Sequence, residues 1–389
     1  MINRLTTFTL FCVAALGVAA QPQPPVRPLW KTAVQTNGEH ELRRSYEAAG
    51  GTTWMLANAK PSGKYNSAES VTELLGFDAN GQELARIDLD ALFAGKDLVR
   101  FDDVALLADR NVALFVTNAA GELFAYTIAP AENRIVAGLR LGGPRVAHHV
   151  TDVVPAEDGR FLVIGRANAR GWMMKLDAKL AIRWDKTFDD EPLTVFHDAA
   201  VRPDGSIVAA GGQLLETSQT NLWVGEITSE GQIAARRLFA GREASIALAP
   251  GRLAVVYDVK SATGWDVFVR GYADGLKEEF TTQLATNLRM PREYRISEGA
   301  KGEWIVAGPT KENRLAVTAF GPTGTAVRSW LAPMENELWE RLWNVGDLAL
   351  RGNDVVVPYT LLTLDDEKRQ VQRIRLIRLP LRAQRQENQ

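Results

Sequence analysis

Short apolar runs separated by turn residues extend along almost the whole chain, and this pattern predicts β-strands. Residues 161–164 and 355–357 are examples, composed of Val, Ile, Leu and Phe. Because such runs have no polar face, we expect strands that are covered on both sides of their sheet. The pattern therefore predicts an all-β protein made of small buried sheets.

A tight turn recurs about every fifty residues, which indicates a repeat protein. It contains Gly51, Asn111, Gly159, Gly205, Gly251, Gly302 and Gly352 in turn. The repeat at residues 198–239 shows the unit most clearly, with four short strands, two tight hairpins and one looser connection. The second hairpin recurs at Asn80-Gly81, Asp274-Gly275 and Thr323-Gly324. Seven turns predict seven sheets.

The last repeat is short of one strand, and the N-terminus offers a replacement. It contains strand-like segments only at 342–350, 354–361 and 370–379, whereas residues 29–34 precede the first complete repeat. An open stack would need polar capping repeats, and none is evident. We therefore predict a seven-bladed β-propeller of four-stranded antiparallel blades over residues 29–381, in which the N-terminal strand completes the last blade. A flexible tail is expected at 382–389.

The first twenty residues are typical of a secretory signal peptide. Arg4 precedes an apolar run at 8–18 and the small residues Ala19 and Ala20, so we expect cleavage after Ala20, a linker at 21–28 and a periplasmic or secreted protein. The single cysteine, Cys12, lies in this segment, so the mature chain would have neither disulfides nor a cysteine nucleophile. No stretch approaches the ~20 apolar residues of a membrane helix, so we expect no transmembrane anchor in the mature protein.

Composition narrows the range of partners. The chain is 46% hydrophobic and 24% charged, which is ordinary for a folded domain. Its formal net charge of −2 gives no electrostatic basis for binding nucleic acid. No Gly-x-Ser-x-Gly motif occurs, so serine hydrolase chemistry has no support. We expect a monomer.

The third repeat carries the closest likeness to a known family. It contains Trp172, the run Lys175-Leu176-Asp177 and Trp184 in an outer strand. This pattern resembles secreted bacterial β-propellers of the kelch, tryptophan-aspartate and quinoprotein-like repeat superfamily. The resemblance covers residues 29–381, although Lys179-Leu180 stands where a glycine is usual. It implies the scaffold and no particular activity.

Polar residues near the start of each innermost strand form the candidate site. The longer loops, at 60–70, 214–220 and 260–264, should share one face, and we expect binding there. Alignment on Pro155 and Pro203 places His149 and His197 at equivalent positions. The corresponding and adjoining positions hold Arg43, Asp102, Asp103, His148, Glu243, Arg292 and Asn344. These side chains are predicted to form a ring round the channel mouth.

Two functions remain open at this point. In the first, the protein is a non-enzymatic binding module for a protein or cell-envelope ligand, with the ring as contact surface and Trp339 as an aromatic anchor. In the alternative, it is a periplasmic hydrolase or lyase acting on a sugar or lactone-like substrate. His149 and His197 would then act as bases or as ligands of a divalent metal, and Asp102 would orient them. No cofactor is predicted for the first function. Most tryptophans are expected to fill the space between blades.

Overall fold

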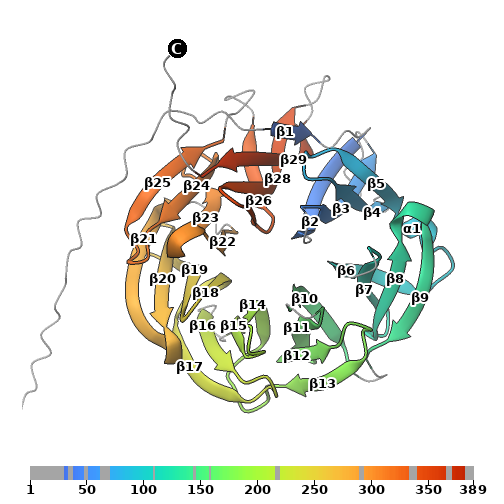
Figure 1. Ribbon diagram of the computed structural model, residues 1–389, viewed down its shortest axis with the longest axis horizontal. Coiled ribbons are helices and arrows are strands. Elements are labelled where there is room, and N and C mark those ends of the chain that lie inside the picture. Colours follow the sequence, from blue (N-terminus) through green and yellow to red (C-terminus); the bar gives the residue numbers. More distant parts are fainter. Residues whose placement is uncertain are drawn as a thin grey trace, which may run out of the picture.

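The computed structural model contains seven antiparallel sheets arranged around a central axis (Figure 1). It describes residues 30–33, 38–47, 51–61, 71–107, 110–142, 146–156, 159–214, 220–288, 293–332, 340–364 and 370–381. The protein is a seven-bladed β-propeller, and this prediction is confirmed. The predicted signal peptide, linker and tail lie outside the described residues.

The first six blades each consist of four consecutive strands, ordered from the axis outward. Blade 1 comprises β2 (Gly38–Glu47), β3 (Thr53–Pro61), β4 (Val71–Phe77) and β5 (Glu83–Asp88), followed by the short helix α1 (Leu89–Leu92). Blade 2 comprises β6 (Leu98–Leu106), β7 (Val112–Asn118), β8 (Leu123–Ala129) and β9 (Arg134–Arg140). Blade 3 comprises β10 (His148–Pro155), β11 (Phe161–Ala167), β12 (Arg170–Leu176) and β13 (Ile182–Thr187).

The remaining three of these blades repeat the arrangement, with single 3-10 turns in some hairpins. Blade 4 comprises β14 (Val195–Val201), β15 (Ile207–Leu214), β16 (Thr220–Ile227) and β17 (Ile233–Ala240). Blade 5 comprises β18 (Arg242–Ala249), β19 (Arg252–Lys260), β20 (Trp265–Ala273) and β21 (Lys277–Leu288). Blade 6 comprises β22 (Arg295–Glu298), β23 (Trp304–Pro309), β24 (Leu315–Phe320) and β25 (Ala326–Leu331).

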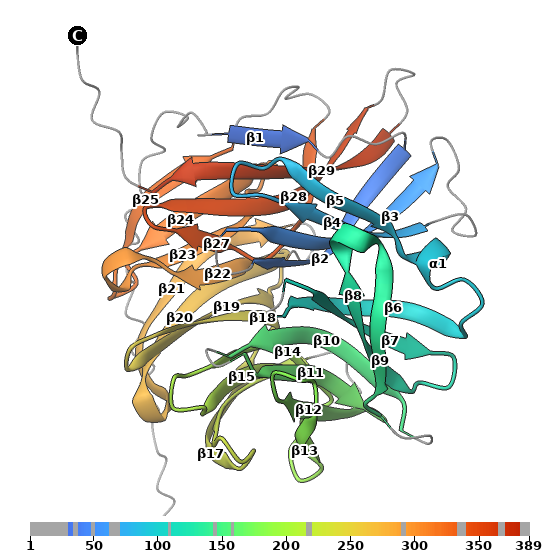
Figure 2. The ribbon, with the colours of Figure 1, turned by 45° about the vertical axis from the view of Figure 1, so that its right-hand side comes forward.

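Blade 7 joins the two ends of the chain, as predicted. It consists of β26 (Arg341–Val345), β27 (Ala349–Arg351), β28 (Asp354–Leu364), β29 (Gln370–Pro380) and β1 (Trp30–Ala33). β1 pairs antiparallel with β29, with Trp30 opposite Arg378, and the two strands run side by side in Figure 2. The innermost strand, predicted as one segment, is divided into β26 and β27. Pro358 of β28 lies opposite the break and has no N–H to continue the ladder.

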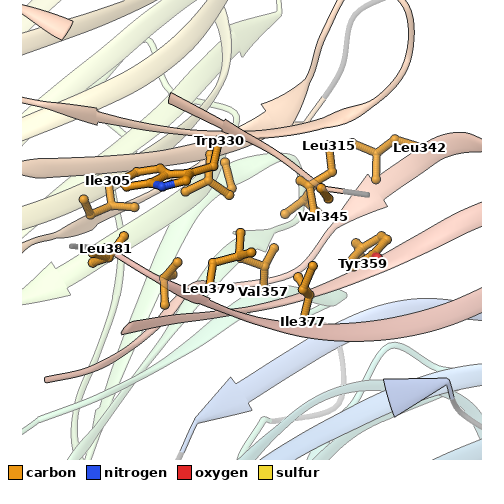
Figure 3. Packing of buried hydrophobic residues seen from close by; sticks show 14 of the residues in the cluster. Ile305, Leu315, Trp330, Leu342, Val345, Val357, Tyr359, Ile377, Leu379 and Leu381 are labelled. Carbon is orange, nitrogen blue, oxygen red and sulfur yellow. The ribbon is translucent and has the colours of Figure 1, made fainter. Parts of the chain in front are cut away.

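The hydrophobic core consists of seven clusters, one between each pair of neighbouring blades. In Figure 3, Ile305, Leu315 and Trp330 of blade 6 face Val357 and Leu379 of blade 7. A further cluster joins blade 7 to blade 1 and contains Leu42, Met55, Leu75, Val356 and Leu376. Each blade is therefore buried on both faces, which explains the near-continuous apolar runs.

Several of the described tryptophans follow the same rule, whereas Trp343 does not. Trp172, Trp223 and Trp304 are fully buried, as expected for residues that fill the space between blades. Trp343, on the innermost strand of blade 7, is 42% exposed.

Side chains of the innermost strands form hydrogen bonds with the backbone of the neighbouring blade. Asp103 Oδ2 of blade 2 accepts from the Val153 N–H of blade 3, at 2.8 Å. Ser45 Oγ of blade 1 accepts from the Asp347 N–H of blade 7, also at 2.8 Å. The closing junction is thus bonded in the same way as an internal one, and the ring holds the channel mouth in a fixed shape.

The two faces of the ring differ. In blade 1, Gly38 at the start of β2 pairs with Pro61 at the end of β3, so the innermost strand begins on the face that carries the loop between the second and third strands. We call this the long-loop face, and the opposite one, which carries the tight turns between first and second strands, the hairpin face. No helix among the described residues is long and apolar enough to cross a membrane.

Candidate functional site

The innermost strands carry an extra residue at matching positions. In six of them the register shifts by one residue, and the residue left over is Arg43, Asp102, Thr151, His197, Glu243 or Trp343. Such a β-bulge redirects a side chain, and bulges are common beside functional sites. Thr151, His197 and Glu243 line a single cavity at the channel mouth. The repeated bulge therefore builds the site.

The strand register corrects the alignment that paired His149 with His197. The bulge in β10 falls after Val150, so Thr151 occupies the position of His197, and His149 lies two residues before it. The alignment used two prolines that are not equivalent. Pro155 is paired within β10, whereas Pro203 lies in the turn after β14. An alignment on these two prolines therefore pairs each residue of β14 with a β10 residue two positions before its true equivalent.

A cavity of about 270 Å³ opens at the long-loop end of the channel, and we call it the channel-mouth pocket. Blades 1, 3, 4, 5 and 6 contribute to its lining, which includes Arg44, His197, Glu243, Asp258, Glu293 and Arg295. Tyr257 and Tyr294 add aromatic walls. Ligand pockets typically occupy ~300–1,000 Å³, so the size suits a small molecule or a single side chain.

Carboxyl groups outnumber guanidinium groups around this pocket among the described residues. The acids are Asp103, Asp152, Asp198, Glu243, Asp258, Glu293 and Asp347, and the nearby bases are Arg43, Arg44, Arg242 and Arg295. Burial raises the pKa of Asp103 to about 7. Burial, with repulsion from Asp103 and Asp198, raises the pKa of Asp152 well above its ordinary value. The channel therefore holds more carboxyl groups than guanidinium groups, and burial keeps part of these carboxyl groups protonated near neutral pH.

The arginines of the pocket are engaged by these acids. The Arg295 Nε lies 3.0 Å from Asp347 Oδ1, and an Arg295 terminal nitrogen lies 3.3 Å from Glu293 Oε2. Burial alone would lower the pKa of Arg295, but Glu293 and Asp347 raise it overall. Arg242 is shared in the same way between Glu243 and Asp258. Both guanidinium groups therefore lie beside carboxylates, although their Nε atoms form no hydrogen bond within the described part of the chain.

Three buried polar atoms of the pocket, Asp258 Oδ1, His197 Nδ1 and Arg295 Nε, form no hydrogen bond within the described part of the chain. Asp258 is 2% exposed, and its Oδ2 lies 3.4 Å from Arg242, but its Oδ1 forms no hydrogen bond. The Nδ1 of His197 is also buried and unbonded. Burial, with a contribution from Arg242, lowers the pKa of His197 to about 4, so its ring is neutral at pH 7. Buried polar groups without partners are rare, and here they line a cavity.

The other histidines lie in different surroundings. His148 is buried, with its ring 4.8 Å from that of Trp172 in an edge-on contact, so it belongs to the core between blades. His149 is partly buried, and its Nδ1 lies 3.2 Å from the Val150 carbonyl oxygen. Burial lowers the pKa of both. Neither His148 nor His149 lines the channel-mouth pocket.

Asp102 and Asp103 are buried and bonded within the scaffold. Asp102 accepts hydrogen bonds from Arg100 Nε and Thr117 Oγ1, and burial raises its pKa. Asp103 accepts from Val104 N–H through Oδ1 and from Val153 N–H through Oδ2. Among the described residues, no imidazole is hydrogen-bonded to a carboxylate, so the proposed acid–base pair is not assembled.

The remaining predicted site residues are distributed around the ring. Asn344 donates through Nδ2 to the Leu42 carbonyl oxygen at 2.8 Å, across the junction of blades 7 and 1. Arg43 and Asn344 line a small recess beside the pocket. Arg292 and Trp339 lie outside the described residues. Within the described part of the chain, no group of three His, Cys, Asp or Glu side chains is arranged to hold a metal ion.

A second cleft, of about 860 Å³, lies on the hairpin face between blades 3 and 4. Its polar groups are bonded to one hairpin. Lys175 Nζ and Trp184 Nε1 donate to the Ser229 carbonyl oxygen, at 3.3 and 2.9 Å, and Lys186 Nζ donates to that of Glu230. This cleft is larger and more open, but it presents fewer unsatisfied groups than the channel-mouth pocket. We therefore regard the channel-mouth pocket as the candidate site.

The sequence analysis did not identify Asp258, Tyr257, Tyr294 or Arg295 as site residues. Asp258 lies on β19, the second strand of blade 5, whereas the predicted ring contains only residues near the starts of the innermost strands. One signal was present. Asp258 interrupts an otherwise apolar run at 253–259, and a lone acid in a buried strand indicates a function or a buried ion pair.

Comparisons with known proteins identify the fold alone. No family model matches the chain, and no curated protein matches its sequence. The structure of the Dos1 propeller is similar with a TM-score of 0.55 and 10% identity, covering 90% of this chain and 94% of that one. An uncharacterised protein from Listeria monocytogenes has a TM-score of 0.46 and 11% identity, with 87% and 95% covered. A prolyl endopeptidase structure has a TM-score of 0.48 and 12% identity, and the match covers 85% of this chain and 48% of that one. At 10% identity, the likeness to the Dos1 propeller supports the β-propeller fold and carries no activity with it.

Proposed function

We propose that this protein is an exported, non-enzymatic binding module that engages a protein or cell-envelope ligand at its long-loop face and channel mouth. The observation that carries the proposal is the channel-mouth pocket, where Asp258 Oδ1 and His197 Nδ1 are buried without partners. A ligand would supply the missing hydrogen bonds.

Two parts of the proposal, the export of the protein and its propeller superfamily, are supported by the sequence. The first twenty residues are typical of a cleaved secretory signal, and the repeat at 171–188 resembles secreted bacterial propellers of the kelch, tryptophan-aspartate and quinoprotein-like superfamily. We infer a periplasmic or secreted monomer without a cofactor.

The geometry favours binding over the hydrolase or lyase alternative. A general base must be held and oriented by a second group. His197 has no such carboxylate among the described residues, and Asp102 is committed to Arg100 and Thr117. Binding requires only complementary charge and shape. The exposed indole of Trp343 adds an anchor of the kind that dominates binding energy at protein surfaces.

Capture from an envelope extract tests this proposal. The wild-type protein should enrich a specific partner, and Trp343→Ala should reduce the affinity for it about tenfold or more, because buried aromatic anchors contribute ~2 kcal/mol or more. Arg183→Ala, on the exposed hairpin face, is the matched control and should leave capture unchanged. Equal capture by all three proteins would place the interaction elsewhere and contradict the proposal.

A further inference from the structure

We propose that the channel-mouth pocket binds a protonated primary amine, with Asp258 Oδ1 as the principal acceptor. The inference rests on the proposed function and specifies the chemistry of the ligand. It is carried by the position of Asp258, by the carboxyl groups of the pocket lining and by the aromatic walls of the pocket.

The position of Asp258 comes first. It is a carboxylate that is almost completely buried, lines the cavity and has one oxygen without any hydrogen bond among the described residues. Its other oxygen is only 3.4 Å from Arg242, which is a loose contact for an ion pair. A carboxylate oxygen can only accept hydrogen bonds, so the group that completes this site must be a donor.

The carboxyl groups of the pocket lining make a cationic donor more favourable than a neutral one. Glu243 and Glu293 add negative charge to the lining of the pocket. Arg44 also lines it, but its charge acts on Asp103 and Asp152, whose pKa values it lowers. An ammonium group would be attracted by Asp258, Glu243 and Glu293, whereas a carboxylate would be repelled by them.

The walls suit an organic cation. Tyr294 lines the pocket and is fixed because its hydroxyl donates to the Pro309 carbonyl oxygen at 2.6 Å. The ring of Tyr257 also borders the pocket, but it packs against Phe239 and Phe268 in the core. Aromatic rings attract cations through their faces. The neutral ring of His197 can accept a second hydrogen bond from the ammonium group without repelling it. The pocket volume of about 270 Å³ matches an alkylammonium head better than a large ligand.

A chemically matched set of probes tests this inference. Butylammonium, butyrate and butanol have the same chain length and differ in charge, and their binding to the full mature protein is measured by calorimetry or ligand-observed NMR. We expect butylammonium to bind in a range of about millimolar, as befits so small a molecule, and the other two to bind at least about tenfold more weakly. Comparable binding of butyrate or butanol, or no binding of butylammonium, would overturn the inference.

Variants then locate the site. Asp258→Asn should weaken butylammonium binding about tenfold or more, because the acceptor loses its charge. Glu243→Gln, at the exposed rim, should weaken butylammonium binding about twofold to threefold. This exposed variant keeps the test valid if the buried Asp258→Asn substitution disturbs the fold. Glu132→Gln removes the same charge far from the channel and should change nothing. An unchanged affinity in both pocket variants would contradict the assignment.

Two further binding measurements identify whether the natural amine is a free small molecule or part of a macromolecule. Cadaverine represents free amines, and a short peptide with one lysine, compared with its Nε-acetylated form, represents an amine on a macromolecule. Preference for either supports the inference, whereas equal binding of the acetylated peptide counts against it. Loss of ammonium binding with partner capture intact would refute only this inference. Ammonium binding without any partner capture would refute only the proposed function.

Discussion

At the residue scale, Asp258 combines a structural cost with the binding role proposed for it. Burial raises its pKa to about 6, although Arg242 lowers it, and Glu243 raises it further. His197 of the same lining is neutral at pH 7, and the charged groups that face the pocket with Asp258 are Arg44, Glu243, Glu293 and Arg295. The fold therefore holds an ionised carboxylate where a neutral group would be more stable. Functional sites commonly carry such a cost.

The pH dependence of stability should reveal this cost. The pKa of Asp258 is higher in the folded state than in the unfolded chain, so its contribution to stability is complete below about pH 4 and is lost as the pH rises through about 6. In Asp258→Asn, the fall in the free energy of unfolding between about pH 4 and about pH 8 should be smaller by about 1–3 kcal/mol. Urea denaturation at the two pH values measures it. An identical fall in both proteins would show that Asp258 titrates normally.

The residue scale also shows where sequence reasoning reached its limit. Glu243, His197 and Asn344 were placed near the channel mouth because polar residues on an innermost strand must face the axis or a neighbouring blade. His148 satisfies the same pattern, but it packs against Trp172 in the core. The choice between these two environments depends on register, and a single bulged residue alters it.

At the element scale, β1 is the strand that closes the ring. It pairs with β29 along four residues, from Trp30 opposite Arg378 to Ala33 opposite Arg375. Without it, β29 would become an exposed edge whose unpaired N–H and C=O groups could pair with another chain. This segment was recognisable in the sequence because the last repeat lacked its outer strand.

Deletion of residues 30–33 should therefore destabilise the whole propeller. We expect a loss of about 2–4 kcal/mol, because each ladder hydrogen bond contributes ~0.5–1.5 kcal/mol, together with aggregation through the exposed edge. Replacement of the same residues by four threonines keeps the backbone pairing and should preserve more of the stability. Chemical denaturation and light scattering measure both effects. A deletion variant as stable as the threonine variant would contradict this role for β1.

At the scale of the whole molecule, closure makes all seven junctions between blades alike. Met55 lies in the cluster that joins blades 7 and 1, and Met174 lies in an internal cluster between blades 2 and 3. Both side chains are completely buried. In an open stack, the terminal position would be weakly packed and tolerant of change.

Met55→Ala and Met174→Ala should consequently have similar effects. Each should lower the free energy of unfolding by about 2–5 kcal/mol, as is typical when a large buried side chain is truncated. Unfolding in guanidinium chloride provides the comparison. A nearly neutral Met55→Ala beside a strongly destabilising Met174→Ala would indicate that the ring is open between blades 7 and 1.

The sequence alone determined the architecture of this protein, because strand pattern and turn residues are local properties that recur in every blade. It also gave the blade count and the strand that closes the ring, since a missing strand can be counted. Only the tertiary structure decided which polar residues share a cavity. Asp258, Tyr257 and Tyr294 meet His197 there across three blades, and their meeting depends on strand register, bulges and closure, which arise from contacts between distant residues. The chemistry of the channel mouth is thus a property of the assembled ring.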